Sequence, residues 1–160
     1  AHEAKRVKCA FAFTLLDLRT NLYVAYGSSF RSEKAAYQKA MDMVSELGIT
    51  FESIRLDRYY SGQSYAAQLA ELSPKVNLYL MPKTNSTVRG PWPWKRAMYR
   101  FVCDPITYLT EYFKRNRSES GFAADKRRTG WTIAQRLEER VATAIAAICT
   151  LHNLSWLGVE

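Results

Sequence analysis

The sequence predicts a single α/β domain, residues 1–160, built around a mixed sheet. The chain has 160 residues, of which 48% are hydrophobic, so it is long enough to bury a core. Segments rich in β-branched and aromatic residues alternate with segments of helical period, in the order β-β-α-β-α-β followed by helices. A short turn joins the first two strands and helices join the later ones. We therefore expect an antiparallel hairpin followed by parallel strands.

The first half of this order rests on a hairpin and a capped helix. Residues 7–16 (VKCAFAFTLL) and 22–27 (LYVAYG) read as strands, and the polar DLRTN segment between them reads as a turn. Residues 32–47 read as a helix, because Ser32 is a suitable N-cap and Gly48 is a suitable stop.

The second half continues this alternation and ends in helices. Strands are expected at 51–57 and 76–82, helices at 61–72, 94–102, 106–116 and 132–157, and a loop at 83–94. Residues 83–118 are thus expected to form a loop and helices between the last strand and the region of Glu119.

Charge and cysteine content limit the functional classes. Lys and Arg number 23 against 15 acidic residues, a net charge of +8, which favours an anionic partner, most often nucleic acid. No apolar run approaches the roughly 18 residues of a membrane-spanning helix, and no signal-peptide pattern is visible. Cys9, Cys103 and Cys149 are scattered in apolar runs without a CxxC pair, which predicts buried free thiols and a reducing cytoplasm.

Asp57 is the first candidate for chemistry. It ends a predicted strand, and functional groups collect at the carboxyl ends of strands in α/β sheets. An aspartate at this position can equally cap the turn that follows. Position alone leaves the two interpretations even.

A second candidate is a stripe of polar residues within a basic segment. On one continuous helix, four side chains would share a face: Tyr112, Arg115, Glu119 and Lys126. Spacing alone favours a solvated face with an Arg115–Glu119 pair. Together with Asp57, however, Glu119 could bind hard divalent cations such as Mg²⁺, while the basic residues hold DNA phosphates.

These four residues, with the spacing Tyr-x2-Arg-x3-Glu-x6-Lys, resemble the signature of a large group of DDE insertion-sequence transposases. We call them the signature residues. The segment RLDRYYS resembles the stretch that carries the second catalytic aspartate of that group, here Asp57, and CTLHNLSWL resembles its closing helix. The resemblance covers the chain from about Lys8 onward.

The resemblance implies a ribonuclease H-like fold, the catalytic core of integrases and transposases. It implies cleavage and strand transfer at transposon ends with two Mg²⁺ or Mn²⁺ ions, in a dimeric complex with DNA in the prokaryotic cytoplasm. Asp57 and Glu119 would be the catalytic metal ligands. Tyr112, Arg115 and Lys126 would contact DNA near the cleaved phosphate.

The first catalytic aspartate of that group has no clear counterpart. Only two strands are predicted before the first helix, and they fit the family's second and third strands. The first strand and its aspartate would then lie upstream of Ala1. The competing candidate is Asp17, which follows an apolar run but falls in the predicted turn.

The remaining candidates leave other functions open. Trp92 and Trp94, beside Lys95 and Arg96, could stack on the bases of single strands, although at least one ring is expected to pack on the domain. His152 is expected to be a hydrogen-bonded packing residue. The alternatives to a transposase are a non-catalytic basic DNA-binding fragment and an α/β protein whose basic face binds an anionic protein.

Overall fold

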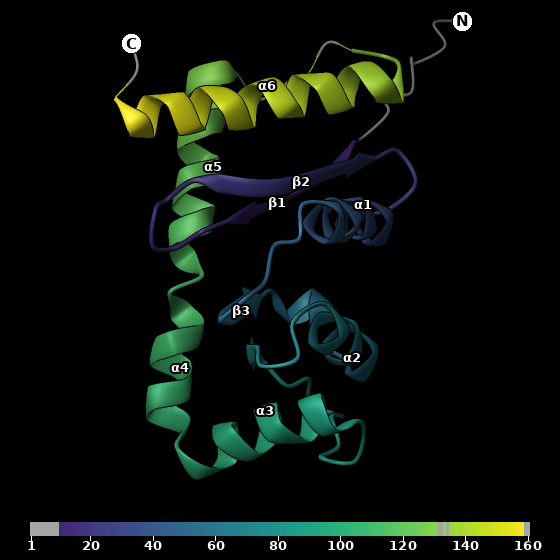
Figure 1. Ribbon diagram of the computed structural model, residues 1–160, viewed down its shortest axis with the longest axis vertical. Coiled ribbons are helices and arrows are strands. Elements are labelled where there is room, and N and C mark those ends of the chain that lie inside the picture. The colour runs from purple at the N-terminus through teal and green to yellow at the C-terminus, as the bar shows by residue number, and fades with distance from the viewer. Residues whose placement is uncertain (1–9, 131–132, 134, 159–160) are drawn as a thin grey trace, which may run out of the picture. The chain divides into compact units, whose positions relative to one another are not determined.

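The computed structural model of the chain describes residues 10–130, 133 and 135–158 (Figure 1). These residues form two compact units. Residues 49–117 form one, which we call the central unit, and the residues before and after them form the other, the terminal unit. Each unit has its own two-stranded sheet and its own buried side chains.

The terminal unit is built on the predicted hairpin. Strands β1 (Phe11–Leu16) and β2 (Tyr23–Ser29) pair antiparallel, and helix α1 (Glu33–Glu46) follows. Ser32 caps α1 as predicted, because its Oγ accepts a hydrogen bond from the Ala35 amide at 3.1 Å.

Two helices from the C-terminal part complete this unit. They are α5 (Asn116–Thr129), which belongs to it from Ser118 on, and α6 (Glu138–Leu157). Figure 1 shows α6 running along the hairpin.

The hairpin is covered by a helix on each face. Phe13 packs edge-on against Tyr37 of α1, and Gly27, opposite Phe13 in the register, lies against the α1 backbone. A bulge shifts the register between Leu15 and Leu16 and thereby sets Tyr23 opposite Leu16. Because paired residues share a face, the bulge turns Tyr23 away from α1. Tyr23 then joins a core cluster with α6, which contains Val141, Ile145 and Cys149.

The central unit is a parallel strand pair with helices. Strands β3 (Ser53–Leu56) and β4 (Asn77–Leu80) pair in parallel, as the crossover predicts, and are connected by the short helix η1 (Arg58–Tyr60) and by α2 (Gln63–Leu72). Helices α3 (Trp92–Cys103) and α4 (Pro105–Phe113) follow β4.

One expectation needs revision, and two stay untested. The helix assumed to continue from Tyr112 to Lys126 is interrupted: the chain turns at Lys114 and Arg115, so the signature residues do not share one helical stripe. The four described strands pair as β1 with β2 and as β3 with β4. A single sheet that contains all four strands therefore stays a prediction, and so does a single domain over residues 1–160.

Candidate functional site

Asp57 lies at the carboxyl edge of the β3–β4 pair, directly after β3. The segments that follow the two parallel strands meet at this edge. Arg58 Nη2 donates to Thr84 Oγ1 at 3.4 Å, and Lys83 Nζ donates to the Tyr59 carbonyl at 3.4 Å. The carboxyl ends of parallel strands are where α/β proteins collect ligand-binding groups. The position of Asp57 thus agrees with both interpretations offered by the sequence.

The Asp57 carboxylate both caps a turn and meets a signature residue. Its Oδ1 accepts a hydrogen bond from the Arg58 amide at 2.6 Å, at the start of η1. The same oxygen lies 3.9 Å from Nη1 of Arg115. The Asp57 side chain is 56% exposed, so it can still accept an external ligand. The structure therefore brings together Asp57 and Arg115, which are 58 positions apart in the sequence.

The aromatic ring of Tyr112 lies against the guanidinium group of Arg115. The Arg115 guanidinium carbon lies 5.5 Å from the centre of the Tyr112 ring. That ring is buried and packs in a core cluster with Tyr79 and Tyr108. Tyr112 consequently has a packing role in the structure, and contact between Tyr112 and DNA stays a prediction.

Helix α4 carries Tyr112, and hydrogen bonds from α4 to the strands hold this helix in place. The Tyr108 hydroxyl accepts a hydrogen bond from the Leu80 amide at 2.7 Å and donates to the Leu80 carbonyl at 3.0 Å. Burial raises the pKa of Tyr108 to about 12, so its hydroxyl remains a donor at neutral pH. On the same helix, Glu111 accepts hydrogen bonds from Arg55 of β3 and from Lys114.

Glu119 and Lys126, the other two signature residues, lie on α5. Glu119 is exposed in the first turn, where the helix dipole favours a carboxylate. Lys126 is seven residues further on, and its Nζ lies 4.4 Å from the centre of the Phe122 ring. Tyr112 and Arg115 belong to the central unit, whereas Glu119 and Lys126 belong to the terminal unit.

A buried polar cluster, which the sequence did not reveal, anchors α5. Asp125 is only 3% exposed. Its Oδ2 accepts a hydrogen bond from the Tyr23 hydroxyl at 2.8 Å, and its Oδ1 lies 3.0 Å from Nδ1 of His152. Nε2 of His152 lies 2.9 Å from the Asn21 carbonyl oxygen. We call Tyr23, Asp125 and His152 the anchor cluster. His152 is the hydrogen-bonded packing histidine that the sequence predicted, whereas no sequence signal marked the burial of Asp125, which stands in a run of charged residues.

Asn153 adds a second anchor between α6 and β2. Its side-chain amide accepts from the Tyr23 amide at 2.8 Å and donates to the Tyr23 carbonyl at 2.9 Å. Burial and the hydrogen bond to Asp125 together raise the pKa of Tyr23, so its hydroxyl stays a donor. These contacts fix α5 and α6 to the hairpin, and α5 carries Glu119.

Asp17 lies in the turn of the hairpin. Its Oδ1 accepts a hydrogen bond from the Arg19 amide at 3.0 Å, and its Oδ2 accepts one from the Thr20 hydroxyl at 2.7 Å. These hydrogen bonds lower the pKa of Asp17. Both carboxylate oxygens serve the turn, as the turn interpretation of this residue expects.

The cysteines differ from one another in exposure. Cys149 is buried, and burial raises the pKa of its thiol to about 12, as expected for a packing thiol. Cys103 is exposed at the end of α3, so the prediction of a buried thiol was wrong there. Its apolar sequence neighbourhood is misleading because Val102 is also exposed. Cys9 lies outside the described residues.

Carboxylate oxygens such as those of Asp57 and Glu119 suit a hard divalent cation in kind. The described residues, however, do not group enough such side chains to form a metal site by themselves. Within residues 10–130, 133 and 135–158, no group of three or more His, Cys, Asp or Glu side chains is arranged to hold a metal ion. Mg²⁺ bound to nucleic acid commonly takes only one or two protein carboxylates, because phosphate oxygens and waters complete its coordination.

Comparison with known proteins gives one clear relationship. The chain is 42% identical over 144 residues to a protein of Archaeoglobus fulgidus named as the probable transposase for insertion sequence element ISA1214. The match covers 90% of the chain but 44% of that relative, so the chain spans less than half of the relative's length. No protein-family model and no solved structure matches the chain. The chain is thus related to a probable transposase. None of the helices in the described residues has the length and apolar content needed to cross a bilayer.

Proposed function

We propose that the chain is part of the catalytic core of a DDE transposase that cleaves and joins DNA strands at transposon ends. The observation that carries this proposal is the 3.9 Å approach of Arg115 to the exposed carboxylate of Asp57. It joins a residue of the transposase-like signature to the candidate aspartate at the carboxyl edge of a parallel strand pair. The relationship to a probable transposase supports the same class of activity.

In this proposal Asp57 and the signature residues have three roles: metal binding, phosphate binding and positioning of Arg115. Asp57 and Glu119 bind Mg²⁺ or Mn²⁺, and Arg115 and Lys126 hold the phosphates that flank the cleaved bond. Two such ions, when bound, activate the attacking oxygen and stabilise the leaving oxygen. Tyr112 positions the Arg115 guanidinium, since its buried ring lies under it. The active assembly is a homodimer on DNA in a prokaryotic cytoplasm.

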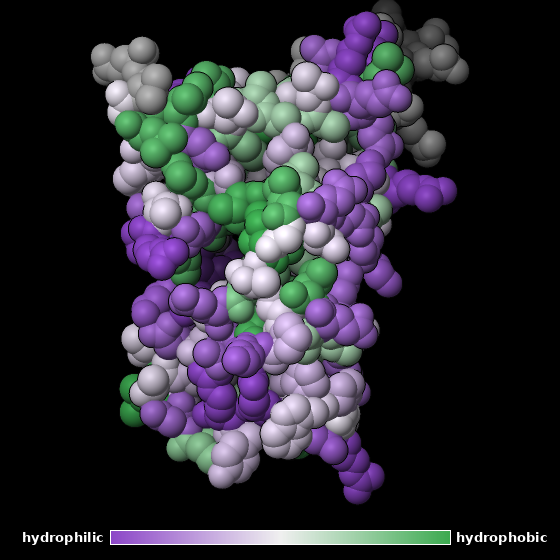
Figure 2. Space-filling view, viewed as in Figure 1, coloured by the Kyte–Doolittle hydropathy of each residue, from purple (hydrophilic) through white to green (hydrophobic). Residues whose placement is uncertain are grey.

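The proposed fold is ribonuclease H-like, and it requires one strand more than the four described. The exposure of β1 supports a further strand. Phe11 is 39% exposed, and most of β1 is only half-buried although its sequence, FAFTLL, is largely apolar. Figure 2 shows hydrophobic side chains exposed over the hairpin on the face in view. A two-stranded sheet is also marginal by itself, so a third strand on β1 would stabilise it. In the family, that strand carries the first catalytic aspartate.

The second candidate function is a DNA-binding fragment without catalytic activity. It is favoured by one observation: both carboxylate oxygens of Asp17, the competing candidate for the first catalytic aspartate, accept hydrogen bonds within the hairpin turn. This alternative keeps the basic surface and predicts DNA binding whose affinity falls steeply with salt.

Substitution of Asp57 separates the two functions. A chain that holds the complete site should nick supercoiled plasmid with Mn²⁺, and Asp57→Asn should abolish that nicking without changing the circular dichroism spectrum. Asp42→Asn is the matched control, because Asp42 is an exposed aspartate on α1. DNA binding without nicking by the wild type would favour the non-catalytic fragment. Equal nicking by wild type and Asp57→Asn would reject the role of Asp57.

A further inference from the structure

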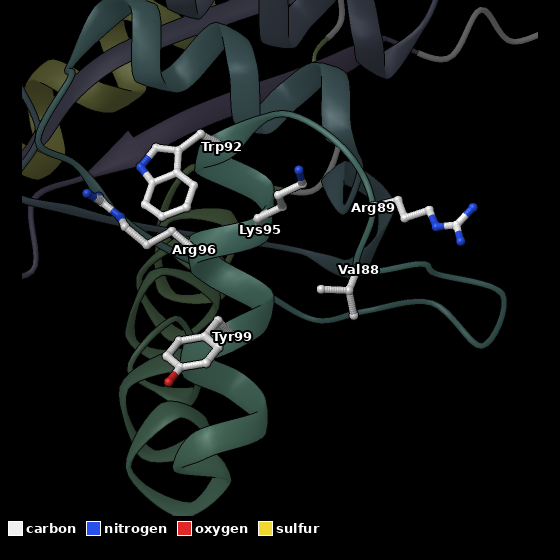
Figure 3. Close-up of a pocket in the computed structure, with 6 residues that line it drawn as sticks. All are labelled: Val88, Arg89, Trp92, Lys95, Arg96 and Tyr99. Carbon is white, nitrogen blue, oxygen red and sulfur yellow. The ribbon is translucent and has the colours of Figure 1, made fainter.

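A pocket of about 480 Å³ on the central unit does not point to one class of ligand. Its lining is one face of α3 and the loop before it: Val88, Arg89, Trp92, Lys95, Arg96 and Tyr99 (Figure 3). Figure 3 shows the Arg89 side chain directed away from the Trp92 and Tyr99 rings, so its charge does not meet them. Trp94 is buried, with its indole Nε1 donating to the Thr87 carbonyl at 2.7 Å, and it is the packed ring that the sequence predicted. The anchor cluster of the terminal unit, by contrast, has a defined set of hydrogen bonds.

One hydrogen bond of the anchor cluster places a proton on Nε2 of His152. Nε2 lies 2.9 Å from the carbonyl oxygen of Asn21, and a carbonyl oxygen can only accept. The hairpin turn holds that oxygen in place, because the Asn21 amide donates to the Asp17 carbonyl at 2.8 Å and Asn21 has a left-handed backbone with a φ of 57°. Nε2 must therefore carry a hydrogen to bond there.

A second contact requires one proton more. Nδ1 of His152 lies 3.0 Å from Oδ1 of Asp125, and the other carboxylate oxygen accepts a hydrogen bond from the Tyr23 hydroxyl at 2.8 Å. A hydrogen must lie between Nδ1 and Oδ1. Either the ring is an imidazolium beside a carboxylate, or it is a neutral imidazole beside a carboxylic acid. Both arrangements hold one proton more than a neutral imidazole beside a carboxylate, and we call it the shared proton.

The groups around Asp125 and His152 leave this pair as the place where the shared proton is gained and lost. Tyr23 on β2 and Cys149 on α6 remain neutral at pH 7, because burial raises the pKa of Tyr23 and raises the pKa of Cys149 to about 12. In the hairpin turn, the Asp17 carboxylate accepts hydrogen bonds from the turn itself.

The pair also fixes one face of α5. Asp125 and Gly121 are four residues apart on this helix, and a Cβ at Gly121 would lie 3.7 Å from the His152 ring. Glu119 lies two residues before Gly121, in the first turn of α5. Without the shared proton, a ring nitrogen would present its lone pair to the Asp125 carboxylate or to the Asn21 carbonyl. The contact between α5 and α6 would then weaken.

We propose that the shared proton fastens α5 to α6, so that Asp125 and His152 are positioning residues for Glu119 and their effect depends on pH. The proposal rests on the proposed function for the role of Glu119, but the shared proton does not. An imidazole in an unfolded chain releases its proton near about pH 6.5. Because the folded chain keeps the proton above that pH, folding takes up one proton there. The folding equilibrium constant therefore falls about tenfold for each pH unit, until the folded pair releases its proton as well.

Nuclear magnetic resonance on the chain without DNA or metal tests for the shared proton. At about pH 7.5, above the ordinary imidazole value, we expect one of two results. Both ring nitrogens of His152 carry hydrogen, or the carboxyl carbon of Asp125 has the chemical shift of an acid. A neutral ring beside an ionised Asp125 would overturn the proposal. Asp125→Asn removes the counter-charge and should leave the ring neutral, whereas Asp42→Asn on α1 should leave the His152 signals as in the wild type.

The positioning of Glu119 is tested by the backbone amide signals of Ser118 and Ser120 as the pH rises. We expect these signals, which flank Glu119, to shift with the same midpoint as the His152 ring. In His152→Gln, which cannot take up the extra proton, they should show no transition at that midpoint. Amide signals of α1, on the other face of the hairpin, are the control and should not follow the ring. Constant Ser118 and Ser120 signals while His152 titrates, or a transition that survives in His152→Gln, would overturn the proposal.

Failure of this proposal is distinguishable from failure of the proposed function. Both readouts are taken on the wild-type chain, so they remain decisive if a variant does not fold. Mn²⁺-dependent nicking by a chain that holds the complete site, if it is lost in Asp57→Asn, would show that the proposed function stands even where the shared proton is absent.

Discussion

His152 on α6 and Asp125 on α5 form a buried pair, with Nδ1 of the imidazole 3.0 Å from Oδ1 of the carboxylate. The side chains are 6% and 4% exposed, so Nδ1 and Oδ1 bond to each other in place of water. The pair joins α5, which carries Glu119, to α6, which packs on the hairpin. It thus links the packing of the terminal unit to the position of a candidate catalytic residue.

Breaking this pair should destabilise the chain. We expect Asp125→Asn and His152→Ala each to lower the free energy of unfolding by about 3 kcal/mol, because each leaves a buried polar partner unsatisfied. Urea unfolding of the two single variants and the double variant gives a coupling energy, expected to be about 1–3 kcal/mol. Additive losses would show that the two side chains act independently. Asp42→Asn, an exposed substitution, should change stability by less than about 0.5 kcal/mol.

The close approach of β2 to α1 predicts a second stability effect. A Cβ at Gly27 would lie 2.0 Å from the Ala36 carbonyl oxygen and 2.8 Å from the Ala40 amide nitrogen, both backbone atoms. Gly27→Ala should therefore destabilise the chain by roughly 1–3 kcal/mol, measured by thermal or urea unfolding.

Gly121 provides the opposite case on α5. A Cβ there would make ordinary contacts, at 3.7 Å from both the His152 ring and the Tyr23 hydroxyl. Gly121→Ala should raise the unfolding free energy by about 0.5–1 kcal/mol through helix propensity. Destabilisation at Gly121, or tolerance at Gly27, would contradict the packing described here.

The pKa of Glu111 predicts an acid-sensitive contribution to stability. Hydrogen bonds from Lys114 and from Arg55 lower the pKa of Glu111 from its ordinary value of 4.5. A carboxylate whose pKa is lower in the folded state stabilises the fold above about pH 4.5, and this contribution disappears as the pH falls through the folded-state pKa. Glu111→Gln should therefore be less stable than wild type at pH 7, by about 1 kcal/mol, and the difference should vanish in acid. A difference independent of pH would argue against an ionic role.

Arg115 should contribute one phosphate contact. Arg115→Ala should weaken duplex DNA binding for every sequence tested and reduce the slope of log K against log salt by about one. Fluorescence anisotropy at several salt concentrations measures this slope. The matched control is Lys75→Ala, an exposed cation before the amino end of β4, at the opposite edge of the same strand pair. An equal change in both variants would mean that Arg115 acts through net charge alone.

Local sequence signals predicted much of the secondary structure. Ser32 caps α1, the polar turn around Asp17 joins a hairpin, and Asp57 directly follows a strand. Each of these features depends on residues that are close in sequence, such as the hydroxyl of Ser32 and the amide of Ala35. That is why the sequence alone could reveal them.

The features that the sequence did not reveal depend on distant partners. Tyr23 reaches the α6 face only because a bulge shifts the register of the hairpin. Asp125 sits in a run of charges, and its burial depends on His152, 27 positions away. The turn at Lys114 and Arg115 divides a segment that reads as continuous helix. It places Arg115 beside Asp57, a pairing that helical spacing could not suggest.

The central proposal is that Asp57 and Glu119 are both metal ligands when the chain is bound to DNA. Paramagnetic broadening by Mn²⁺, measured on backbone amide signals of the chain bound to a DNA duplex, tests it directly. We predict that substoichiometric Mn²⁺ broadens the signals beside Asp57, those of Leu56 and Arg58, together with those beside Glu119, Ser118 and Ser120. Asp57→Asn should restore both sets. Broadening beside only one of the two carboxylates, or broadening that survives Asp57→Asn, would contradict the claim.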